Sequence, residues 1–501
     1  MLKLEPRLLA AIDLGSNSFR LLIARAETAG ASALVQPVDS LRKSVRLAAG
    51  LDADRRLDSE SRSRGLAVLS LFSQRLRAYS PQSVRAVATN TLRVARNAAD
   101  FLADAEAVLG YPIEVISGNE EARLIWVGVS HAIRSEERKL IIDIGGGSTE
   151  CIVGDSGKPL MLDSIDVGCV SATLAHCPQG VISQIAFEHA RRMLRQRFAS
   201  AARSARALGF ERAIGTSGTA KALHHIARDF LGAKALDRPA LAAMQAALFG
   251  ADVATTAPFN TLKPDRRGVI TGGLLVMSAV FDAFELERIE YSDAALRDGI
   301  LVELSAAIDG TDIREQSVSH AVQRLGLDAD RCSRMSRRAL ALYDQAARAV
   351  REERLERRAL LDWATRLSEC GRLVANDSFH RHSAYMLRHM SLPGFSHPEQ
   401  QILANLALGQ TGGLRKLRGL FADDLGWISV LALRLTRLIE AGSVTHAEPP
   451  LPALFFKHGE ARIEIDARWL EANPNVRFSL LEETTRWTEA QLLSRFDLKE
   501  L

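Results

Sequence analysis

The sequence predicts an internally duplicated α/β fold with a cleft between the two copies, followed by an all-α domain and a small C-terminal α/β module. An apolar strand, an Asp-x-Gly turn of small polar residues and a second apolar strand occur in that order at Asp13 and again at Asp143. A repeat of this kind indicates two related units that enclose a cleft. Beyond about Asp312, long amphipathic patterns rich in Arg, Ala and Leu continue to Glu440 and predict a separate helical domain.

Composition limits the class of protein. A chain of 501 residues is too long for one compact core, so two to four domains are expected. A hydrophobic content of 47% with 25% charged residues is typical of a soluble globular protein. The net charge of +4 does not indicate a nucleic-acid-binding coat, although a local basic groove for a polyanion is compatible with it.

Cysteine usage and apolar runs indicate the compartment. The five cysteines are scattered without a CxxC pair, which argues against a disulfide framework or a zinc site and favours the cytoplasm, with peripheral membrane association still compatible. The start of the chain lacks the features of a signal peptide. The longest apolar stretch, residues 268–281, is too short to span a bilayer and is predicted to be a buried helix, so no membrane span is expected.

The first third of the chain is predicted to alternate strands and helices. Residues 8–13 and 19–26 are apolar runs around a Gly/Ser/Asn turn, which predicts a hairpin. Residues 84–88 precede a helix from Thr91, and residues 113–116 precede a helix that continues through Val129.

The pattern restarts at Lys139, with strands predicted at 140–143 and 149–153. Residues 213–219 form a further strand-to-helix turn, and residues 289–292 precede another helix. Near the end, residues 461–466 alternate as in a strand, and the chain is expected to finish in a helix. The domain boundaries expected from these patterns are 1–124, 125–308, 309–445 and 446–501.

Two turns carry the residues expected to bind phosphate. Glycines allow successive backbone N–H groups to approach phosphate oxygens, and Ser or Asn side chains add neutral donors. One such turn would be an ordinary hairpin turn, but two matched copies beside one cleft favour phosphate binding. A third turn at the start of a helix either binds phosphate or only caps the helix. The phosphate-binding candidates are Gly15, Ser16, Asn17, Ser18, Gly145, Gly146, Gly147, Ser148, Gly215, Ser217 and Gly218.

The segment ISGNEEAR contains two adjacent carboxylates with different expected roles. Ser117 followed three residues later by Glu120 matches a capping box, which gives Glu120 a structural role. Glu121 lies about 100° further round the helix and is free to face the cleft. Because phosphoanhydride hydrolysis needs a carboxylate that orients and deprotonates water, Glu121 is the predicted base; a surface ion-pair partner is the alternative.

Further charged residues are candidates for metal and phosphate binding. Asp13 and Asp143 end the two strands and can hold Mg²⁺ directly or through water, since hard cations require oxygen ligands. Glu150, just past the second loop, can hold the metal or steer the attacking water. Arg93 begins a helix at a strand end and is the best candidate for neutralising phosphate. Weaker candidates are Arg20, Arg46, Arg267 and Lys221.

With these motifs, the chain closely resembles the exopolyphosphatase/guanosine pentaphosphate phosphohydrolase family of the actin-like ATPase superfamily. The matching segments include AAIDLGSNSFRLLIAR, VISGNEEARLIWVGV, IIDIGGGSTE, IGTSGTAKAL and YSDAALRDGILVEL. The resemblance implies two actin-like (ribonuclease H-like) domains flanking a cleft, an HD-like helical domain, a small C-terminal α/β module and a homodimer. It also implies Mg²⁺, is compatible with a monovalent cation such as K⁺, and places catalytic roles on Glu121, Glu150 and Arg93, with Asp143 as a further acidic residue.

The helical domain departs from the family pattern. Residues 367–371 (LSECG) stand where members carry a His-Glu or His-Asp pair, and residues 409–413 (GQTGG) stand where Tyr-His-Arg is common. The HD-like domain is therefore expected to have lost its metal site and to serve binding or dimerisation.

Two substrates fit the resemblance. Asn119, residues 168–171 and the YSDAALRDG segment resemble the polyphosphate branch, so processive exopolyphosphatase activity is the expected function. Hydrolysis of the 5′-phosphate of guanosine pentaphosphate (pppGpp) is the alternative, and both activities can coexist. A sugar kinase or filament protein would share the loops but lack the SGNEEAR carboxylates.

A path for long polyphosphate, or else a solvated helix face, is predicted at Arg415, Lys416, Arg418, Arg434 and Arg437.

Overall fold

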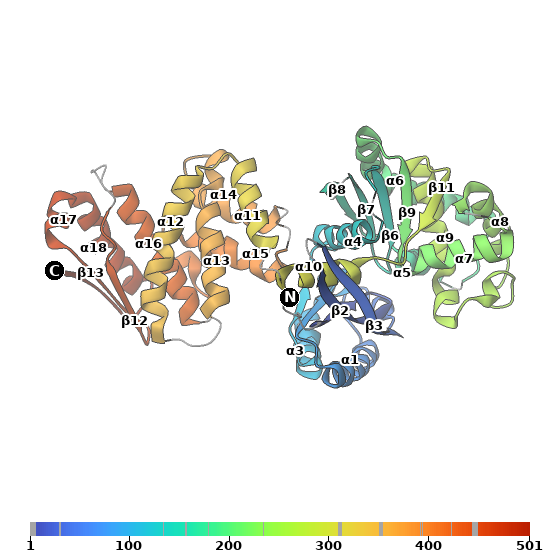
Figure 1. Cartoon of the computed structure of the whole chain (residues 1–501), viewed down its shortest axis with the longest axis horizontal. Coiled ribbons are helices and arrows are strands. Elements are labelled where there is room, and N and C mark those ends of the chain that lie inside the picture. Colours follow the sequence, from blue (N-terminus) through green and yellow to red (C-terminus); the bar gives the residue numbers. More distant parts are fainter. Residues whose placement is uncertain are drawn as a thin grey trace. The chain divides into compact units, whose positions relative to one another are not determined.

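The chain forms two compact units, residues 1–311 and 312–501, in a computed structural model (Figure 1). The structure describes residues 7–29, 32–133, 135–155, 158–178, 180–233, 235–308, 313–349, 354–390, 392, 394–421, 423–442 and 449–501.

Unit 1 contains two sheets with the same core topology. In the first sheet the strand order is β3-β2-β1-β4-β5, and in the second it is β10-β11-β9-β6-β7-β8. In each copy the first three strands are antiparallel neighbours, and two later strands add in parallel. The predicted duplication is therefore confirmed. The strands are β1 (Arg7–Leu14), β2 (Ser18–Ala29), β3 (Ser32–Ser44), β4 (Ser83–Ala88), β5 (Ile113–Val115), β6 (Lys139–Ile144), β7 (Thr149–Asp155), β8 (Lys158–Ile165), β9 (Arg212–Thr216), β10 (Leu236–Asp237) and β11 (Arg288–Tyr291).

Strand alternation gives each sheet two apolar faces. In β6, Leu140 and Ile142 belong to one buried cluster with α9, whereas Ile141 belongs to another with α4 and α10. The helix α9 (Pro264–Phe284) confirms the predicted buried helix and begins earlier than expected, at a proline. Among the described helices, α9 is long and apolar enough to cross a membrane, but most of it is buried inside the structure.

Two helices occupy the space between the sheets. The helix α4 (Gly118–Ala132) and the helix α10 (Leu296–Ile308) share one apolar cluster with residues of β1, β6 and β7. The expected boundary between residues 124 and 125 therefore falls inside α4. The other helices of unit 1 are η1 (Leu47–Gly50), α1 (Ser59–Tyr79), α2 (Asn90–Val94), α3 (Ala98–Leu109), α5 (Cys169–His176), α6 (Gln184–Leu208), α7 (Ser217–Leu231), α8 (Arg238–Leu248) and η2 (Phe259–Thr261).

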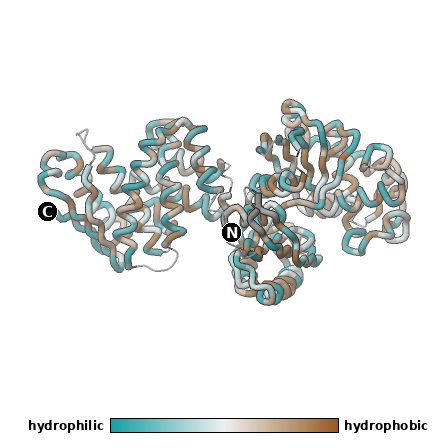
Figure 2. Tube along the Cα trace, in the orientation of Figure 1, coloured by the Kyte–Doolittle hydropathy of each residue, from teal (hydrophilic) through white to brown (hydrophobic). Residues whose placement is uncertain are grey.

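Unit 2 is helical with a small sheet, and both parts share one hydrophobic core. Leu431 of α16 and Trp487 of α18 belong to the same buried cluster. Figure 2 shows hydrophobic residues alternating with hydrophilic ones along these helices. The chain ends in the strand β14, not in the expected helix. The elements are α11 (Ile313–Arg324), α12 (Ala329–Ala346), η3 (Ala347–Ala349), α13 (Arg354–Leu367), η4 (Cys370–Leu373), α14 (Phe379–His389), α15 (His397–Gly409), η5 (Leu414–Leu417), α16 (Asp424–Gly442), β12 (Ala453–Lys457), β13 (Glu460–Ile465), α17 (Ala467–Ala472), α18 (Pro474–Glu489) and β14 (Arg495–Glu500).

Candidate active site

A cleft in unit 1 lies where the two copies of the fold meet, at the ends of β1 and β6. The turn after each strand contributes to its wall, as do the start of α7 and the start of α10. Of the predicted phosphate-binding residues, those that line the cleft are Gly15, Ser16, Asn17, Ser18, Gly145, Gly146, Ser148, Ser217 and Gly218.

The first two phosphate loops face each other at close range. A Cβ added to Gly146 would lie 2.9 Å from the Ser16 Cβ and 3.3 Å from the Asn17 backbone nitrogen, so glycine is required there. Two predictions are not supported. Gly147 packs against the Asn90 side chain, and Gly215 packs against Ala220, and neither is among the residues that line the cleft.

The third turn is tied to the second loop. The Thr216 hydroxyl donates to Asp143 Oδ2 at 2.6 Å, and the Ser217 hydroxyl donates to the Ile144 carbonyl at 2.8 Å. Gly218 lies directly against the Arg266 guanidinium, because a Cβ placed on it would overlap that group. The turn therefore belongs to the cleft, which favours its role in binding over a purely structural cap.

Glu121 reaches the cleft from the first turn of α4. The Ser117 side chain accepts from the Glu120 backbone N–H at 3.1 Å, which confirms the predicted N-cap. The Glu120 carboxylate, which would complete the box, turns instead to Arg123. One residue further on, Glu121 is 8% exposed and lines the cleft, as predicted.

Arg93 contacts Glu121 directly. Its Nη1 lies 3.5 Å from Glu121 Oε2 and donates to the Ile116 carbonyl at 2.9 Å. Burial raises the pKa of Glu121 well above its ordinary value, the Glu150 carboxylate adds to this rise, and Arg93 opposes it. A carboxylate with a raised pKa is suited to accept a proton from water.

Three acidic residues lie near Glu121. In the hairpin register, Asp143 is paired with Glu150, whereas Asp13 is paired with Arg20 in the first copy. Burial raises the pKa of each of the three carboxyl groups. Asp13 and Asp143 line the cleft, while Glu150 is 1% exposed and accepts from the Ser164 hydroxyl at 2.9 Å.

This arrangement suits a metal ion held partly by substrate. Within the described part of the chain, no group of three His, Cys, Asp or Glu side chains gathers as a ligand set. Mg²⁺ is commonly bound by one or two carboxylates together with substrate phosphates and water. Asp13 and Asp143 fit that pattern, because both are buried carboxylates that line one cleft and the charge of Asp143 raises the pKa of Asp13. Direct ligation by Glu150 stays a prediction.

Three arginines bring positive charge into the cleft beside its carboxylates. Arg20, Arg266 and Arg297 line it. Burial lowers the pKa of Arg266 and of Arg297, and the charge of Arg20 lowers both further. Guanidinium groups crowded in this way favour a bound polyanion.

Arg20 was one of the weaker predicted candidates, whereas Arg266 and Arg297 were not predicted. Two of the weaker candidates are engaged elsewhere: Lys221 pairs with Asp293 at 2.5 Å, and Arg267 lies 3.4 Å from the Ala254 carbonyl. They do not line the cleft, and neither does Arg46. The only available signal for Arg297 was its position in the YSDAALRDG segment.

A duplicated α/β unit with two facing glycine-rich loops, a buried carboxylate and three arginines fits an enzyme that acts on phosphate groups. Comparisons with known proteins agree: residues 22–307 match the Ppx/GppA phosphatase family and residues 313–484 match domain III of that family. The chain belongs to the Ppx/GppA phosphatase family. Its two sheets have the actin-like fold of that family, and it hydrolyses phosphoanhydrides.

Similar proteins cover the chain to different extents. A guanosine-5′-triphosphate,3′-diphosphate pyrophosphatase of Pseudoalteromonas translucida (strain TAC 125) is 34% identical over 490 residues, which cover 96% of this chain and 97% of that protein. A protein of the same name from Vibrio vulnificus (strain YJ016) is 32% identical over 484 residues, with 96% of each chain covered. The crystal structure of an exopolyphosphatase-like protein is 26% identical, with a TM-score of 0.55, and covers 61% of this chain and 99% of its own.

Proposed function

We propose that the protein is a pppGpp 5′-phosphohydrolase that releases orthophosphate and leaves ppGpp. The main support for this proposal is a sequence comparison. The chain is 34% identical, over nearly its whole length, to a relative whose name gives guanosine-5′-triphosphate,3′-diphosphate as the substrate. This order differs from the sequence-based expectation, in which polyphosphate came first. The residues that favoured polyphosphate were a few motif positions such as Asn119, whereas the similarity extends over both units.

The residues that line the cleft have different proposed roles. The two facing loops hold the terminal phosphate, and Glu121 orients a water for in-line attack on its phosphorus. The proton of that water passes to Glu121 as the bridging P–O bond breaks and the ppGpp oxygen leaves. Arg20, Arg266 and Arg297 neutralise the phosphates that are not cleaved.

Mg²⁺ is proposed as the cofactor. Asp13 and Asp143 would hold it, and when bound it supplies charge neutralisation for the phosphate oxygens. The Thr216 hydroxyl, which donates to Asp143, fixes the orientation of that carboxylate.

Exopolyphosphatase activity is the second candidate, favoured by the similar exopolyphosphatase-like structure and by a basic groove in unit 2. Arg381, Arg415 and Lys416 line this groove. Two residues of the predicted path are not available to a polyanion, because Arg434 and Arg437 are buried against Glu483 and Glu369. Arg418 is exposed, and its guanidinium donates to the Ala490 carbonyl.

Phosphate release from pppGpp, GTP, tripolyphosphate and long-chain polyphosphate distinguishes the candidates. We expect the highest kcat/KM for pppGpp, with ppGpp as the nucleotide product on ion-exchange chromatography. GTP is the matched control, because it carries the same 5′-triphosphate without the 3′-diphosphate. A higher kcat/KM for long-chain polyphosphate would overturn the proposal in favour of the second candidate.

A further inference from the structure

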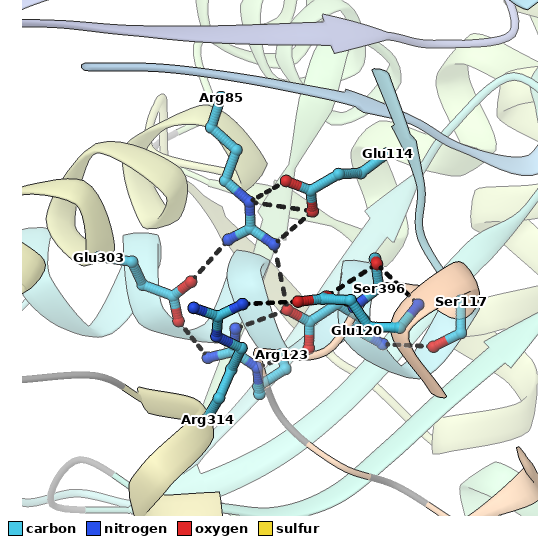
Figure 3. A network of polar contacts seen from close by, with 9 residues as sticks. Arg85, Glu114, Ser117, Glu120, Arg123, Glu303, Arg314 and Ser396 are labelled. Carbon is cyan, nitrogen blue, oxygen red and sulfur yellow. Dashed lines mark hydrogen bonds and ion pairs between the residues drawn. The ribbon is translucent and has the colours of Figure 1, made fainter. Parts of the chain in front are cut away.

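Five charged side chains of unit 1 form a network that includes Glu120, the residue before Glu121. Its members are Arg85, Glu114, Glu120, Arg123 and Glu303, all of which are labelled in Figure 3. Arg123 holds Glu120 through two hydrogen bonds of 2.7 Å each, and its Nη1 lies 2.5 Å from Glu303. Arg85 contacts the other oxygen of Glu303 at 2.9 Å and also pairs with Glu114 at 3.0 Å. The carboxylate of Glu303, on α10, therefore joins an arginine of α4 to an arginine of β4.

The centre of the network is desolvated. The side chains of Glu120 and Arg123 are 4% and 5% exposed and that of Glu303 is 10% exposed, whereas those of Arg85 and Glu114 are 13% and 33% exposed. Removing charges from water is expensive, so a buried network often stabilises a fold no better than apolar residues would. In some proteins a buried charged network instead fixes one arrangement of the elements that it joins.

The helices joined by Glu303 also touch through their backbones. A Cβ added to Gly128 of α4 would overlap the Ala295 carbonyl, and one added to Gly299 of α10 would overlap the Leu124 carbonyl. Two glycines facing each other leave no side chain between the helices at the crossing. Away from this crossing, the contact between Arg123 and Glu303 is a charged link between α4 and α10.

Each of these helices places a charged residue in the cleft. On α4, Glu121 directly follows Glu120, the residue that Arg123 clamps. On α10, Arg297 lies in the first turn, two residues before Gly299. None of the five network residues lines the cleft.

We propose that Glu303, with Arg85 and Arg123, is a positioning device that locks α4 against α10 and so holds Glu121 in line with the phosphate and Arg297. This inference rests on the proposed function, in which Glu121 orients the attacking water. The network positions Glu121 and, through Glu121, the attacking water. The two glycine-rich loops lie on other elements and stay in place when the network is changed.

The central test is Glu303→Gln, which keeps the shape and removes the charge shared by the two arginines. We expect kcat per folded molecule to fall about 10- to 100-fold, the scale for a sub-ångström to 1 Å misplacement, while KM changes little. Glu303→Asp, which restores the charge, should recover part of kcat. Glu114→Gln, which removes a partner of Arg85 only, should have a smaller effect and serves if Glu303→Gln folds poorly.

The matched control is Glu483→Gln in unit 2. Glu483 is also buried in an arginine pair, with Arg434, and lies in a different unit from the cleft. We expect it to lower the melting temperature and leave kcat per folded molecule unchanged. The folded fraction is measured by near-ultraviolet circular dichroism in every variant.

The kinetics of Glu303→Gln either support the positioning role of the network or overturn it. If Glu303→Gln loses activity only in proportion to its folded fraction, or raises KM without lowering kcat, the network is structural and the proposal is overturned. All variants are compared with the wild type on both pppGpp and tripolyphosphate. A wild type that prefers tripolyphosphate would contradict the proposed substrate, while the ratio of variant to wild-type kcat would still test the positioning device.

Discussion

At the scale of single residues, hydrolysis depends on a carboxylate held out of water. We expect Glu121→Gln to lower kcat by at least about two orders of magnitude with KM nearly unchanged, because the amide cannot accept a proton from water. Phosphate release under saturating pppGpp measures the effect. Glu60→Gln is the control, since Glu60 also lies in the first turn of a helix but is 84% exposed. Activity of Glu121→Gln close to that of the control would show that another group activates water.

The same carboxylate predicts the pH dependence. Glu121 acts only when ionised, and burial raises its pKa, so kcat/KM should keep rising with pH well above the ordinary glutamate value of about 4.3. Because the Arg93 charge lowers the pKa of Glu121, Arg93→Met should move this acidic limb to higher pH as well as reduce the maximum. The profile of log kcat/KM against pH measures both. A limb that stays in place or moves to lower pH in Arg93→Met would contradict the ion pair.

Residues within a local motif could be predicted, and residues gathered by the fold could not. Glu121 followed from Ser117 and Glu120, because helix capping and the helical period depend on a few neighbouring positions. Arg266 and Arg297 come from the starts of two helices that only the folded chain brings to one cleft. The role of Glu120 was predicted as structural, and its actual partner, Arg123, lies one turn away along the same helix.

At the scale of elements, the start of α7 packs closely against the start of α9. Gly218→Ala would place a Cβ on the Arg266 guanidinium, and that flexible group must move away from the cleft. We expect kcat/KM for pppGpp to fall about tenfold, the scale of one charge-assisted contact of 1.5–3 kcal/mol, with little change in melting temperature. Steady-state kinetics and thermal unfolding measure the two effects.

Gly268→Ala on α9 is the matched control for this substitution. A Cβ at Gly268 meets only Arg46, at 3.6 Å, so it fits without displacement. Alanine is a better helix former than glycine, so this variant should be as active as the wild type and no less stable. Equal activity of the two alanine variants would show that Arg266 does not contact the substrate.

Elements with a strong period were predictable and those without one were missed. The strands β1 and β6 are short apolar runs that end in an Asp-x-Gly turn, and this pattern identified both copies. The strand β3 was missed because its sequence, SALVQPVDSLRKS, contains a proline and many polar residues, as expected of a sheet edge. The final strand β14, RFDLKE, was missed because its alternation of Phe496 and Leu498 with charged residues extends over six residues only and follows a long helical pattern.

At the scale of the whole molecule, the chain divides where its composition changes. The amphipathic patterns beyond Asp312 predicted a separate helical domain, and unit 2 begins at that residue. The expected fourth domain from residue 446 instead shares its hydrophobic core with the helices, through Leu454 and Trp487 among others. Sequence patterns mark a change of secondary structure, but only packing shows whether a core is shared.

The division of the chain predicts that unit 1 is sufficient for the chemistry. Every residue that lines the cleft belongs to residues 1–311, as do the three apolar clusters that support it. We therefore expect a fragment of residues 1–311 to fold and to release phosphate from tripolyphosphate within about an order of magnitude of the full chain, since a unit with its own core can fold alone. Glu121→Gln in the fragment is the control against contaminating phosphatases. A folded fragment with no more activity than this control would show that unit 2 contributes a residue to catalysis.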